Sequence, residues 1–143
     1  MTTINPYLNF PGNAEEAFNF YKSVFGGEFI MVQRYKDTPE AGAVDEADKN
    51  KIMHIAYPIG KGNILMATDA LASMGRPLTQ GNNFYLSIGT DSDEEASKIF
   101  NGLSAGGQVT MPLAKTFWGS YFGMFNDKFG IQWMVSHEEN HTA

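Results

Sequence analysis

The stretch Asn5-Pro6-Tyr7-Leu8-Asn9 returns later in the chain as Asn83-Phe84-Tyr85-Leu86-Ser87, and this recurrence decides the fold. Two further matches follow in the same order, because Glu15-Glu16-Ala17 returns as Glu94-Glu95-Ala96 and Gly26-Gly27-Glu28-Phe29 returns as Gly106-Gly107-Gln108-Val109. The offset between the matches grows from 78 to 80 residues along the chain. A repeat this long predicts a duplicated half-domain, since the repeats of solenoid proteins are shorter.

Each half has the pattern of one strand, one helix and three further strands. Apolar and polar residues alternate in the first strands, at 4–10 and 83–90, as expected for strands with one buried face. The later strand-like segments lie at 28–35, 51–59, 63–69, 108–115, 120–126 and 131–136. The alternation predicts two sets of side chains. One set faces the helices and comprises Ile4, Leu8, Phe10, Phe84, Leu86 and Ile88; the other lies on the opposite faces and comprises Asn5, Tyr7, Asn9, Asn83, Tyr85 and Ser87.

The two helices have clear start and stop residues. The first is predicted to begin at Asn13, as its N-terminal cap, and to end at Gly26. The second is predicted to begin at Ser92, with Glu95 as its capping-box partner. Segment 36–50 is acidic and rich in turn-forming residues, so we expect an exposed loop with little to bury.

These elements predict one α+β domain over residues 1–143. Its first βαβββ module spans 1–70, a linker spans 71–81 and the second module spans 82–137. A chain of this length fits a single domain.

The composition is that of an acidic globular protein without cysteine. The 143 residues carry a net charge of −6 at pH 7 and are 43% hydrophobic. The lack of cysteine excludes disulfides, thiolate metal sites and cysteine nucleophiles. No basic patch indicates a nucleic-acid partner, and no apolar run reaches the ~20 residues that span a bilayer. We therefore expect a cytoplasmic protein that binds neither nucleic acid nor membrane.

Short motifs from about residue 4 to residue 135 carry a family resemblance. They are Pro6-Tyr7-Leu8, Ala14-Glu15-Glu16-Ala17, Phe25-Gly26-Gly27, Met53-His54-Ile55-Ala56, Leu65-Met66-Ala67-Thr68-Asp69, Trp118-Gly119 with Phe122-Gly123, and Asp127-x-Phe129-Gly130-Ile131-x-Trp133-Met134. This combination resembles the vicinal oxygen chelate superfamily, which includes glyoxalase I, extradiol dioxygenases and the bleomycin- and fosfomycin-resistance proteins. Within it the chain is similar to the PhnB-like branch, often labelled 3-demethylubiquinone-9 3-methyltransferase. The resemblance implies mixed, curved sheets around a pocket, helices on the convex side, and a homodimer.

The resemblance also directs attention to four metal-ligand positions, on the first and last strands of the two halves. In this chain they fall on Asn5 or a neighbour, on 83–85, on Met66 and on Met134. Amides are weak ligands for divalent ions, and thioethers suit Cu(I). We therefore expect no family-type metal site and no cofactor. A divalent ion at a shifted site, held by His54 and Asp69, is the alternative.

The remaining motifs of common enzymes are missing. The glycine pairs 26–27 and 106–107 follow helices, so they act as helix ends and do not form the glycine-rich strand–helix turn that a methyl-donor cofactor needs. There is also no P-loop and no Gly-x-Ser-x-Gly motif. Methyl transfer is therefore unsupported by the residues.

Aromatic and methionine side chains are the remaining indication of a site. Such side chains adapt to organic ligands or stack on them, although most in a small domain are core. The predicted pocket residues are Tyr7, Asn9, His54, Met66, Tyr85, Trp118, Tyr121 and Met134. Trp118 is the strongest candidate, with loop or dimer packing as its alternative role.

Two functions follow from this set. The first is a metal-free protein that binds a small organic molecule in an aromatic, methionine-lined pocket. The second is an enzyme of the same superfamily, a glyoxalase-like lyase, dioxygenase or transferase. It would use a shifted metal site or an acid–base group, for which His54, Asp69 and Tyr121 are the candidates.

Overall fold

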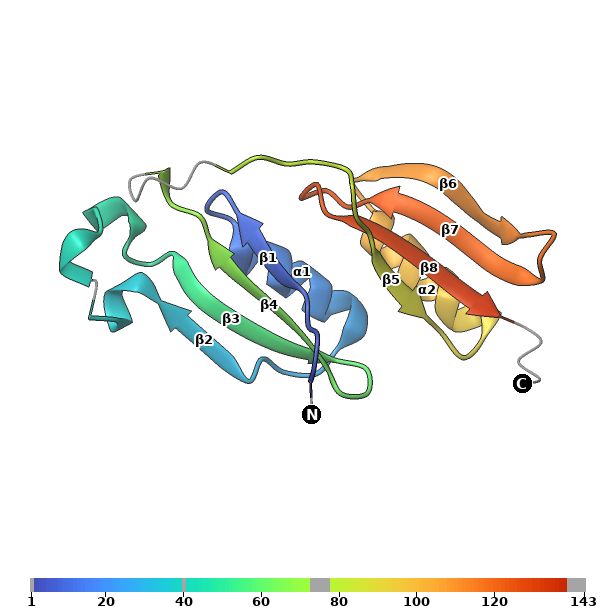
Figure 1. Cartoon of the computed structure of the whole chain (residues 1–143), viewed down its shortest axis with the longest axis horizontal. Helices are drawn as coiled ribbons and strands as arrows, with labels where there is room; N and C mark the ends of the chain where they lie inside the picture. Colours follow the sequence, from blue (N-terminus) through green and yellow to red (C-terminus); the bar gives the residue numbers. More distant parts are fainter. Residues whose placement is uncertain (1, 40, 73–77, 139–143) are drawn as a thin grey trace. The chain divides into compact units, whose positions relative to one another are not determined.

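The computed structural model describes residues 2–39, 41–72 and 78–138, and it divides into two compact units, Met1–Thr79 and Gln80–Ala143. Each unit repeats the predicted order of strand, helix and three strands (Figure 1). Unit 1 contains β1 (Tyr7–Phe10), α1 (Ala14–Phe25), β2 (Met31–Arg34), β3 (Ile52–Ile59) and β4 (Asn63–Asp69). Unit 2 contains β5 (Leu86–Gly89), α2 (Asp93–Ser104), β6 (Gln108–Lys115), β7 (Ser120–Asn126) and β8 (Gln132–Glu138).

Each unit has one mixed four-stranded sheet. The strand orders are β1-β4-β3-β2 and β5-β8-β7-β6. The first strand pairs in parallel with the last, while the other neighbours are antiparallel. This arrangement is the vicinal oxygen chelate fold, as the resemblance implied. No helix among the described residues is long and apolar enough to cross a membrane.

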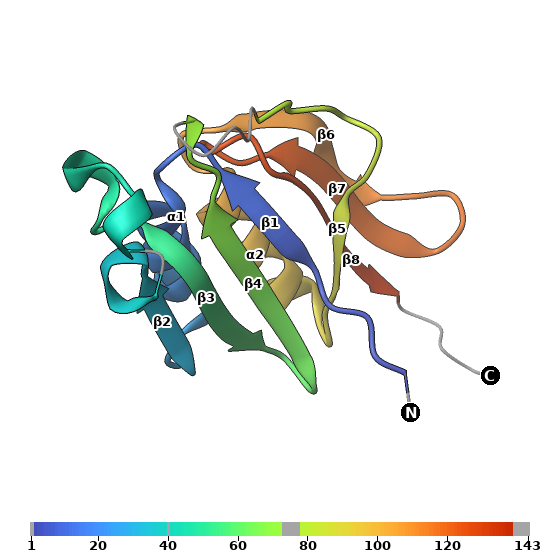
Figure 2. The ribbon, with the colours of Figure 1, turned by 60° about the vertical axis from the view of Figure 1, so that its left-hand side comes forward.

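In unit 1 the helix covers one face of the sheet (Figure 2). Leu8 and Phe10 are buried, and the Phe10 ring lies 6.2 Å from that of Phe18 on α1. Tyr57 on β3 also packs on Phe18, with ring centroids 6.4 Å apart. Because side chains alternate along a strand, the neighbouring positions point the other way. We call that surface the helix-free face of unit 1; it carries Tyr7, Asn9, His54 and Met66.

Unit 2 is built in the same way. Phe125 on β7 packs edge-on against Phe100 of α2, with ring centroids 5.1 Å apart. A side chain at Gly123 would also meet Phe100, so that position faces the helix and a Cβ there would force its neighbours to move. The alternate residues form the helix-free face of unit 2, which carries Ser87, Met111, Phe122, Met124 and Met134.

Two residues predicted to face the helices do not. Ile4 is 91% exposed and Phe84 is 59% exposed. The prediction was wrong because both strands are shorter than the sequence pattern: β1 begins only at Tyr7 and β5 only at Leu86. Both residues therefore precede the strand pairing that would hold them against a helix.

The predicted loop at 36–50 buries more than expected. It contains three short 3-10 helices, η1 (Tyr35–Asp37), η2 (Ala41–Ala43) and η3 (Glu46–Asp48). Val44 is buried together with Tyr35 and Leu71, and Met53 packs against this group. The sequence did not predict this burial, because Val44 stands among acidic residues and the residues it packs against, Tyr35 and Leu71, lie outside segment 36–50. Within the predicted linker 71–81, residues 73–77 lie outside the described residues, as do 139–143 at the chain end.

Candidate functional site

The helix-free face of unit 1 carries a hydrogen-bonded phenol and imidazole. The hydroxyl of Tyr7 lies 3.2 Å from Nδ1 of His54, and the two ring centroids are 5.6 Å apart. The phenol donates to Nδ1 when the imidazole proton is on Nε2, and it accepts when the proton is on Nδ1. Tyr7 is 47% exposed, so the pair stands at the surface of unit 1.

Two more predicted residues lie beside this pair. Met66 on β4 stands opposite Tyr7 in the parallel pairing, and Asn9 stands opposite Thr68. Paired residues share a face, so the amide, the phenol, the imidazole and the thioether lie on one surface. Four of the eight predicted pocket residues, Tyr7, Asn9, His54 and Met66, are therefore brought together by one sheet.

Asp69 is placed on the other face of that sheet. Its carboxylate is 1% exposed and accepts hydrogen bonds from the backbone N–H of Ala14 at 2.9 Å and of Ile52 at 2.8 Å. It therefore caps α1, a role that the sequence assigned to Asn13, whose side chain makes no capping hydrogen bond. Burial raises the pKa of Asp69 above its ordinary 3.8, and the N–H donors of Ile52 and Ala14 oppose this shift.

The capping role separates Asp69 from His54. The imidazole lies on the helix-free face and bonds to Tyr7, whereas the carboxylate points to the start of α1. The two side chains proposed for a shifted metal site are thus on opposite faces. Among the described residues no group of three His, Asp or Glu side chains lies close enough to hold a metal ion.

Trp118 lies at the tip of the β6–β7 hairpin. Thr116 and Ser120 close this turn, because the Thr116 hydroxyl donates to the Ser120 carbonyl at 2.9 Å and accepts from the Ser120 N–H at 3.1 Å. Trp118 is 59% exposed, and its ring lies 6.2 Å from that of Phe122 on the helix-free face of unit 2. Its indole therefore extends the face that carries Met134.

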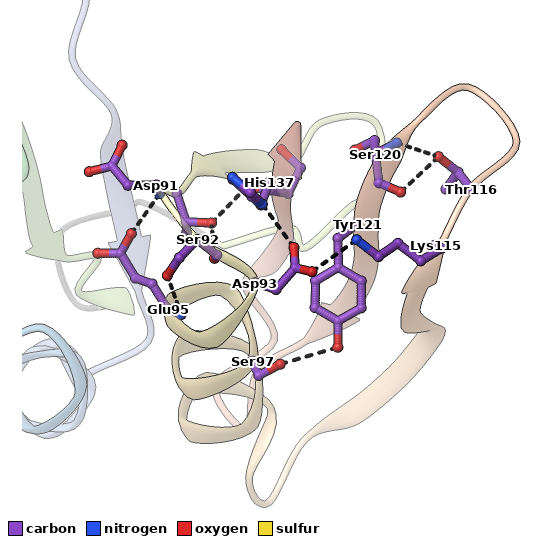
Figure 3. Close-up of polar contacts among 12 residues, drawn as sticks. Asp91, Ser92, Asp93, Glu95, Ser97, Lys115, Thr116, Ser120, Tyr121 and His137 are labelled. Carbon is purple, nitrogen blue, oxygen red and sulfur yellow. Dashed lines mark hydrogen bonds and ion pairs between the residues drawn. The ribbon is translucent and has the colours of Figure 1, made fainter. Parts of the chain in front are cut away.

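Tyr121 belongs to the opposite, helix-covered face of unit 2 (Figure 3). Its hydroxyl lies 3.1 Å from that of Ser97 on α2, and Lys115 Nζ lies 5.3 Å from the centre of its ring. The same lysine pairs at 2.9 Å with Asp93, whose other oxygen lies 2.8 Å from His137 Nδ1. Hydrogen bonds from Lys115 and His137 hold the pKa of Asp93 below its usual 3.8.

This polar cluster was not predicted from the sequence. Its members come from α2 and from the ends of three strands, so only the folded sheet brings them together. The neighbouring helix cap, in contrast, was predicted: Ser92 Oγ accepts from the Glu95 N–H at 3.0 Å, and Glu95 accepts from the Asp91 N–H at 2.8 Å (Figure 3). The last predicted pocket residue, Tyr85, is half-buried just before β5.

A polar hollow of about 250 Å³ lies at the start of α1, between Gly12, Lys51 and the 36–50 loop. Its charged groups are already paired inside unit 1. Lys51 donates to the Gly12 carbonyl at 3.1 Å, and Glu15 makes a two-point ion pair with Arg34 at 3.0 and 2.6 Å. Most of the hydrogen-bonding groups that line the hollow are thus already bonded to other residues of unit 1.

The strand positions that the resemblance assigns to metal ligands do not fit a hard divalent ion. Met66 stands opposite Tyr7 in unit 1, and Met134 stands opposite Ser87 in unit 2. These four residues offer thioethers and hydroxyls, whereas Mn²⁺ and similar ions prefer carboxylate oxygen or imidazole nitrogen. The pairing places Tyr7 and Ser87 opposite the two last-strand positions, whereas the prediction was Asn5 or a neighbour and 83–85.

Comparison with known proteins gives consistent results. The sequence model of the 3-demethylubiquinone-9 3-methyltransferase family matches residues 2–136 of this chain. The protein YjdN of Escherichia coli is 31% identical over 142 residues, which cover 93% of each chain.

Solved structures show the same fold. The protein PA1353 from Pseudomonas aeruginosa has a TM-score of 0.87 at 39% identity, covering 98% of this chain and 100% of that one. A PhnB protein from Bacillus cereus, described as a putative 3-demethylubiquinone-9 3-methyltransferase, has a TM-score of 0.76 at 28% identity, with coverage of 95% and 99%. The fosfomycin resistance protein FosX from Listeria monocytogenes, solved with Mn(II) and sulfate, shares the fold, with a TM-score of 0.61 at 13% identity and coverage of 96% and 93%.

Proposed function

The chain belongs to the 3-demethylubiquinone-9 3-methyltransferase family, the PhnB-like branch of the glyoxalase/bleomycin resistance/dioxygenase superfamily, and we propose that it binds a small organic molecule without a family-type divalent metal. The observation that carries this proposal is the Tyr7–His54 hydrogen bond on the helix-free face of unit 1. It supplies an orienting polar group next to the thioether of Met66. Apolar surface with a few converging polar groups is the usual composition of a small-molecule site.

The proposed ligand has a flat or apolar body and one hydrogen-bonding group. A carbonyl, hydroxyl or carboxylate of the ligand would engage Tyr7, His54 or Asn9, since these side chains both donate and accept. The apolar body would lie on Met66, which stands opposite Tyr7 on the same face. Thioethers follow irregular shapes, which suits a site that accepts a class of molecules.

The first test uses the aromatic anion 1-anilinonaphthalene-8-sulfonate as a probe, in buffer with EDTA. Replacing His54 by Ala, or Tyr7 by Phe, removes about 1.4 kcal/mol of polar contact and should weaken binding about tenfold. His137→Ala, which removes an imidazole in unit 2, is the matched control and should leave the affinity unchanged. Equal affinity of wild type and both unit 1 variants, with circular dichroism showing intact folds, would overturn the proposal.

The metal part of the proposal has its own test. Elemental analysis of untagged protein, purified without chelator or added metal, should show no stoichiometric Zn, Ni, Mn or Fe. The residues at these strand positions support this expectation, because neither the Tyr7–Met66 pair of unit 1 nor the Ser87–Met134 pair of unit 2 includes a carboxylate or an imidazole. One bound divalent ion per chain would contradict it.

Methyl transfer is not part of the proposal, although the family name mentions it. Gly26 and Gly27 follow α1, and the turn before α1 has only Gly12. The first backbone N–H of that helix is already bonded to Asp69. A cofactor that approached the helix start would have to displace this buried carboxylate.

An acid–base enzyme is the second candidate, and the Tyr7–His54 contact favours it too. A histidine held by a hydrogen bond to one ring nitrogen presents the other nitrogen in a defined direction. The substrate 5-nitrobenzisoxazole tests for such a base, because removal of its C3 proton breaks the N–O bond and releases a coloured cyanophenolate. Saturable turnover that His54→Ala abolishes would support an enzyme, while a rate no faster than free imidazole would exclude this candidate base.

We also propose that the protein forms a homodimer. Ile30, just before edge strand β2, is 63% exposed, and Val32 within that strand is 43% exposed. Phe117, in the β6–β7 turn, is 97% exposed. Apolar side chains exposed along a sheet edge or at the tip of a hairpin are commonly covered by a partner. Sedimentation equilibrium should give twice the 15.8 kDa chain mass, and a monomer at micromolar concentration would contradict this.

A further inference from the structure

Three methionines are paired across neighbouring strands of unit 2, and the register of β6 shifts on either side of its methionine. Met111 on β6 pairs with Met124 on β7, and Met124 pairs with Met134 on β8. Paired residues point to the same face, and Phe125, next to Met124, packs on α2. The three thioethers therefore share the helix-free face. We call these three residues the methionine row.

The row has the spacing and freedom to converge on one atom. Residues paired across strands have Cα atoms about 4.5–5.5 Å apart, and methionine has three rotatable bonds. The outer two sulfur atoms can therefore turn toward the central one. Met124 and Met134 are half-buried and Met111 is 43% exposed, so the row is accessible from solvent.

From this register we propose that the methionine row binds one soft monovalent cation, Cu(I) or its redox-inert analogue Ag(I). Thioethers select soft ions over Mg²⁺, Ca²⁺ or Mn²⁺. The chain has no cysteine, so no thiolate competes for the ion. This site is distinct from the organic-ligand function proposed above and does not depend on it.

The surroundings of the row favour a cation. Lys115 and His137, at the ends of β6 and β8, bond to Asp93 on the α2 side of the sheet and so do not face the row. Phe122 lies two residues from Met124 on the same face of β7, and Trp118 packs against it. Aromatic faces attract cations, so these rings add to the thioether ligands.

Unit 1 contains the equivalent row with one change, which provides an internal control. There Met31 pairs with Ala56, Ala56 pairs with Met66, and Met66 pairs with Tyr7. The central residue is alanine, so the two thioethers are separated by two strand spacings, roughly 9–10 Å. We therefore expect one cation per chain, bound in unit 2.

The experiment is a titration of the full chain, labelled with ¹³C at the methionine methyl groups, with silver nitrate in chloride-free buffer. Single Met→Leu substitutions assign the methyl signals. The signals of Met111, Met124 and Met134 should shift together and saturate at one equivalent of Ag(I). Cu(I), kept reduced with ascorbate under anaerobic conditions, should shift the same three.

Substitutions decide whether the row is the site. Met124→Leu keeps the volume nearly unchanged and should weaken Ag(I) binding at least tenfold. Met66→Leu in the unit 1 row and Met53→Leu in the buried group with Tyr35 are the controls and should bind as wild type does. Unchanged binding by Met124→Leu, equal shifts at all methionines, or loss of binding on His54→Ala or His137→Ala would each overturn the proposal.

The outcome is separable from the proposed function. The aromatic probe is measured with EDTA and without silver, and its critical residues are Tyr7 and His54 in unit 1. A protein that binds the probe but not Ag(I) retains the proposed function and loses the methionine-row site. The reverse result keeps the site and removes the function.

Discussion

The indole nitrogen of Trp133 donates a hydrogen bond to Oδ2 of Asp127 at 2.8 Å, and both side chains are buried. The other oxygen of Asp127 accepts from the backbone N–H of Phe129 at 2.8 Å and of Ile131 at 3.1 Å. One carboxylate thus shapes the β7–β8 turn and ties it to the core. The family motif around Asp127 and Trp133 is therefore explained by the fold and requires no ligand.

Replacing Asp127 by Ala should destabilise the protein by about 3 kcal/mol or more, because the change leaves three N–H donors without this acceptor. Asp127→Asn keeps one acceptor oxygen and should cost less. Urea unfolding followed by circular dichroism measures both variants. The exposed Glu94→Ala is the control, and a loss no larger than in that control would contradict the role of Asp127.

Replacing Gly123 by Ala should also destabilise the chain. The added Cβ would lie 2.6 Å from a ring carbon of Phe100 and 2.9 Å from the backbone Cα of Leu113. Overpacking of this kind costs about 1–3 kcal/mol. The matched control is Gly89→Ala in β5, where nothing lies within 4 Å of the new methyl group and stability should change little. Equal thermal midpoints for the two variants would show that β6 can move away.

Asp69 should make stability depend on pH in an unusual direction. Burial raises its pKa in the folded state above 3.8, so the folded chain binds this proton more readily than the unfolded chain. Stability contributed by this group therefore rises as the pH falls through the raised pKa toward 3.8. Asp69→Asn cannot titrate. The stability of wild type relative to this variant should grow between pH 7 and pH 4 in denaturant titrations, and a shrinking difference would contradict the raised pKa.

Asp93 should show the opposite dependence. Its folded-state pKa is lowered below 3.8 by hydrogen bonds from Lys115 and His137. Its contribution is present above 3.8 and is lost as the pH falls through the lower folded-state pKa. The thermal midpoint of wild type should exceed that of Asp93→Asn at pH 6, and the two should approach each other near pH 2. A difference that does not change with pH would exclude this ion pair as its source.

Arg34 should be hard to replace even by lysine. Its guanidinium bonds both oxygens of Glu15 on α1 and the carbonyl of Asn50 at 2.8 Å, so it connects the helix, β2 and the 36–50 loop. Lysine cannot make this planar two-point contact. Because Glu15 is about half exposed, the expected loss is only about 0.5–1 kcal/mol. Chemical denaturation at low and high salt checks it, and Lys22→Arg at another surface pair is the control.

Local features were predictable from the sequence, and contacts between distant segments were not. The Ser92–Glu95 cap was predicted because the two residues are three positions apart. The cap of α1 was assigned to Asn13, whereas the real acceptor, Asp69, comes from the end of β4. No local pattern indicates a partner at that sequence distance.

The repeat predicted the position of the site on the first strands with an error of two residues. Sequence matching equates Tyr7 with Tyr85, but the sheet pairing equates Tyr7 with Ser87, since these stand opposite Met66 and Met134. A shift of two residues keeps the face, so the predicted sides of the strands were correct from Tyr7 and Leu86 onward. Tyr121 was included among pocket residues because its aromatic character does not reveal which side of β7 it occupies. The methionine row was likewise hidden, because its register depends on irregular pairing in β6.

The parallel closing pairs have a consequence for the newborn chain. Tyr7 finds its partner Met66, and Leu86 finds Trp133, only near the end of each half. The N-terminal segment is synthesised first. Leu8 and Phe10 therefore remain exposed to water and to chaperones until the β3–β4 hairpin has emerged from the ribosome. Such long-range pairings are slow to form. A chain stalled before Asn63 should therefore remain open to proteases, whereas one released a few residues beyond Asp69 can complete its first sheet.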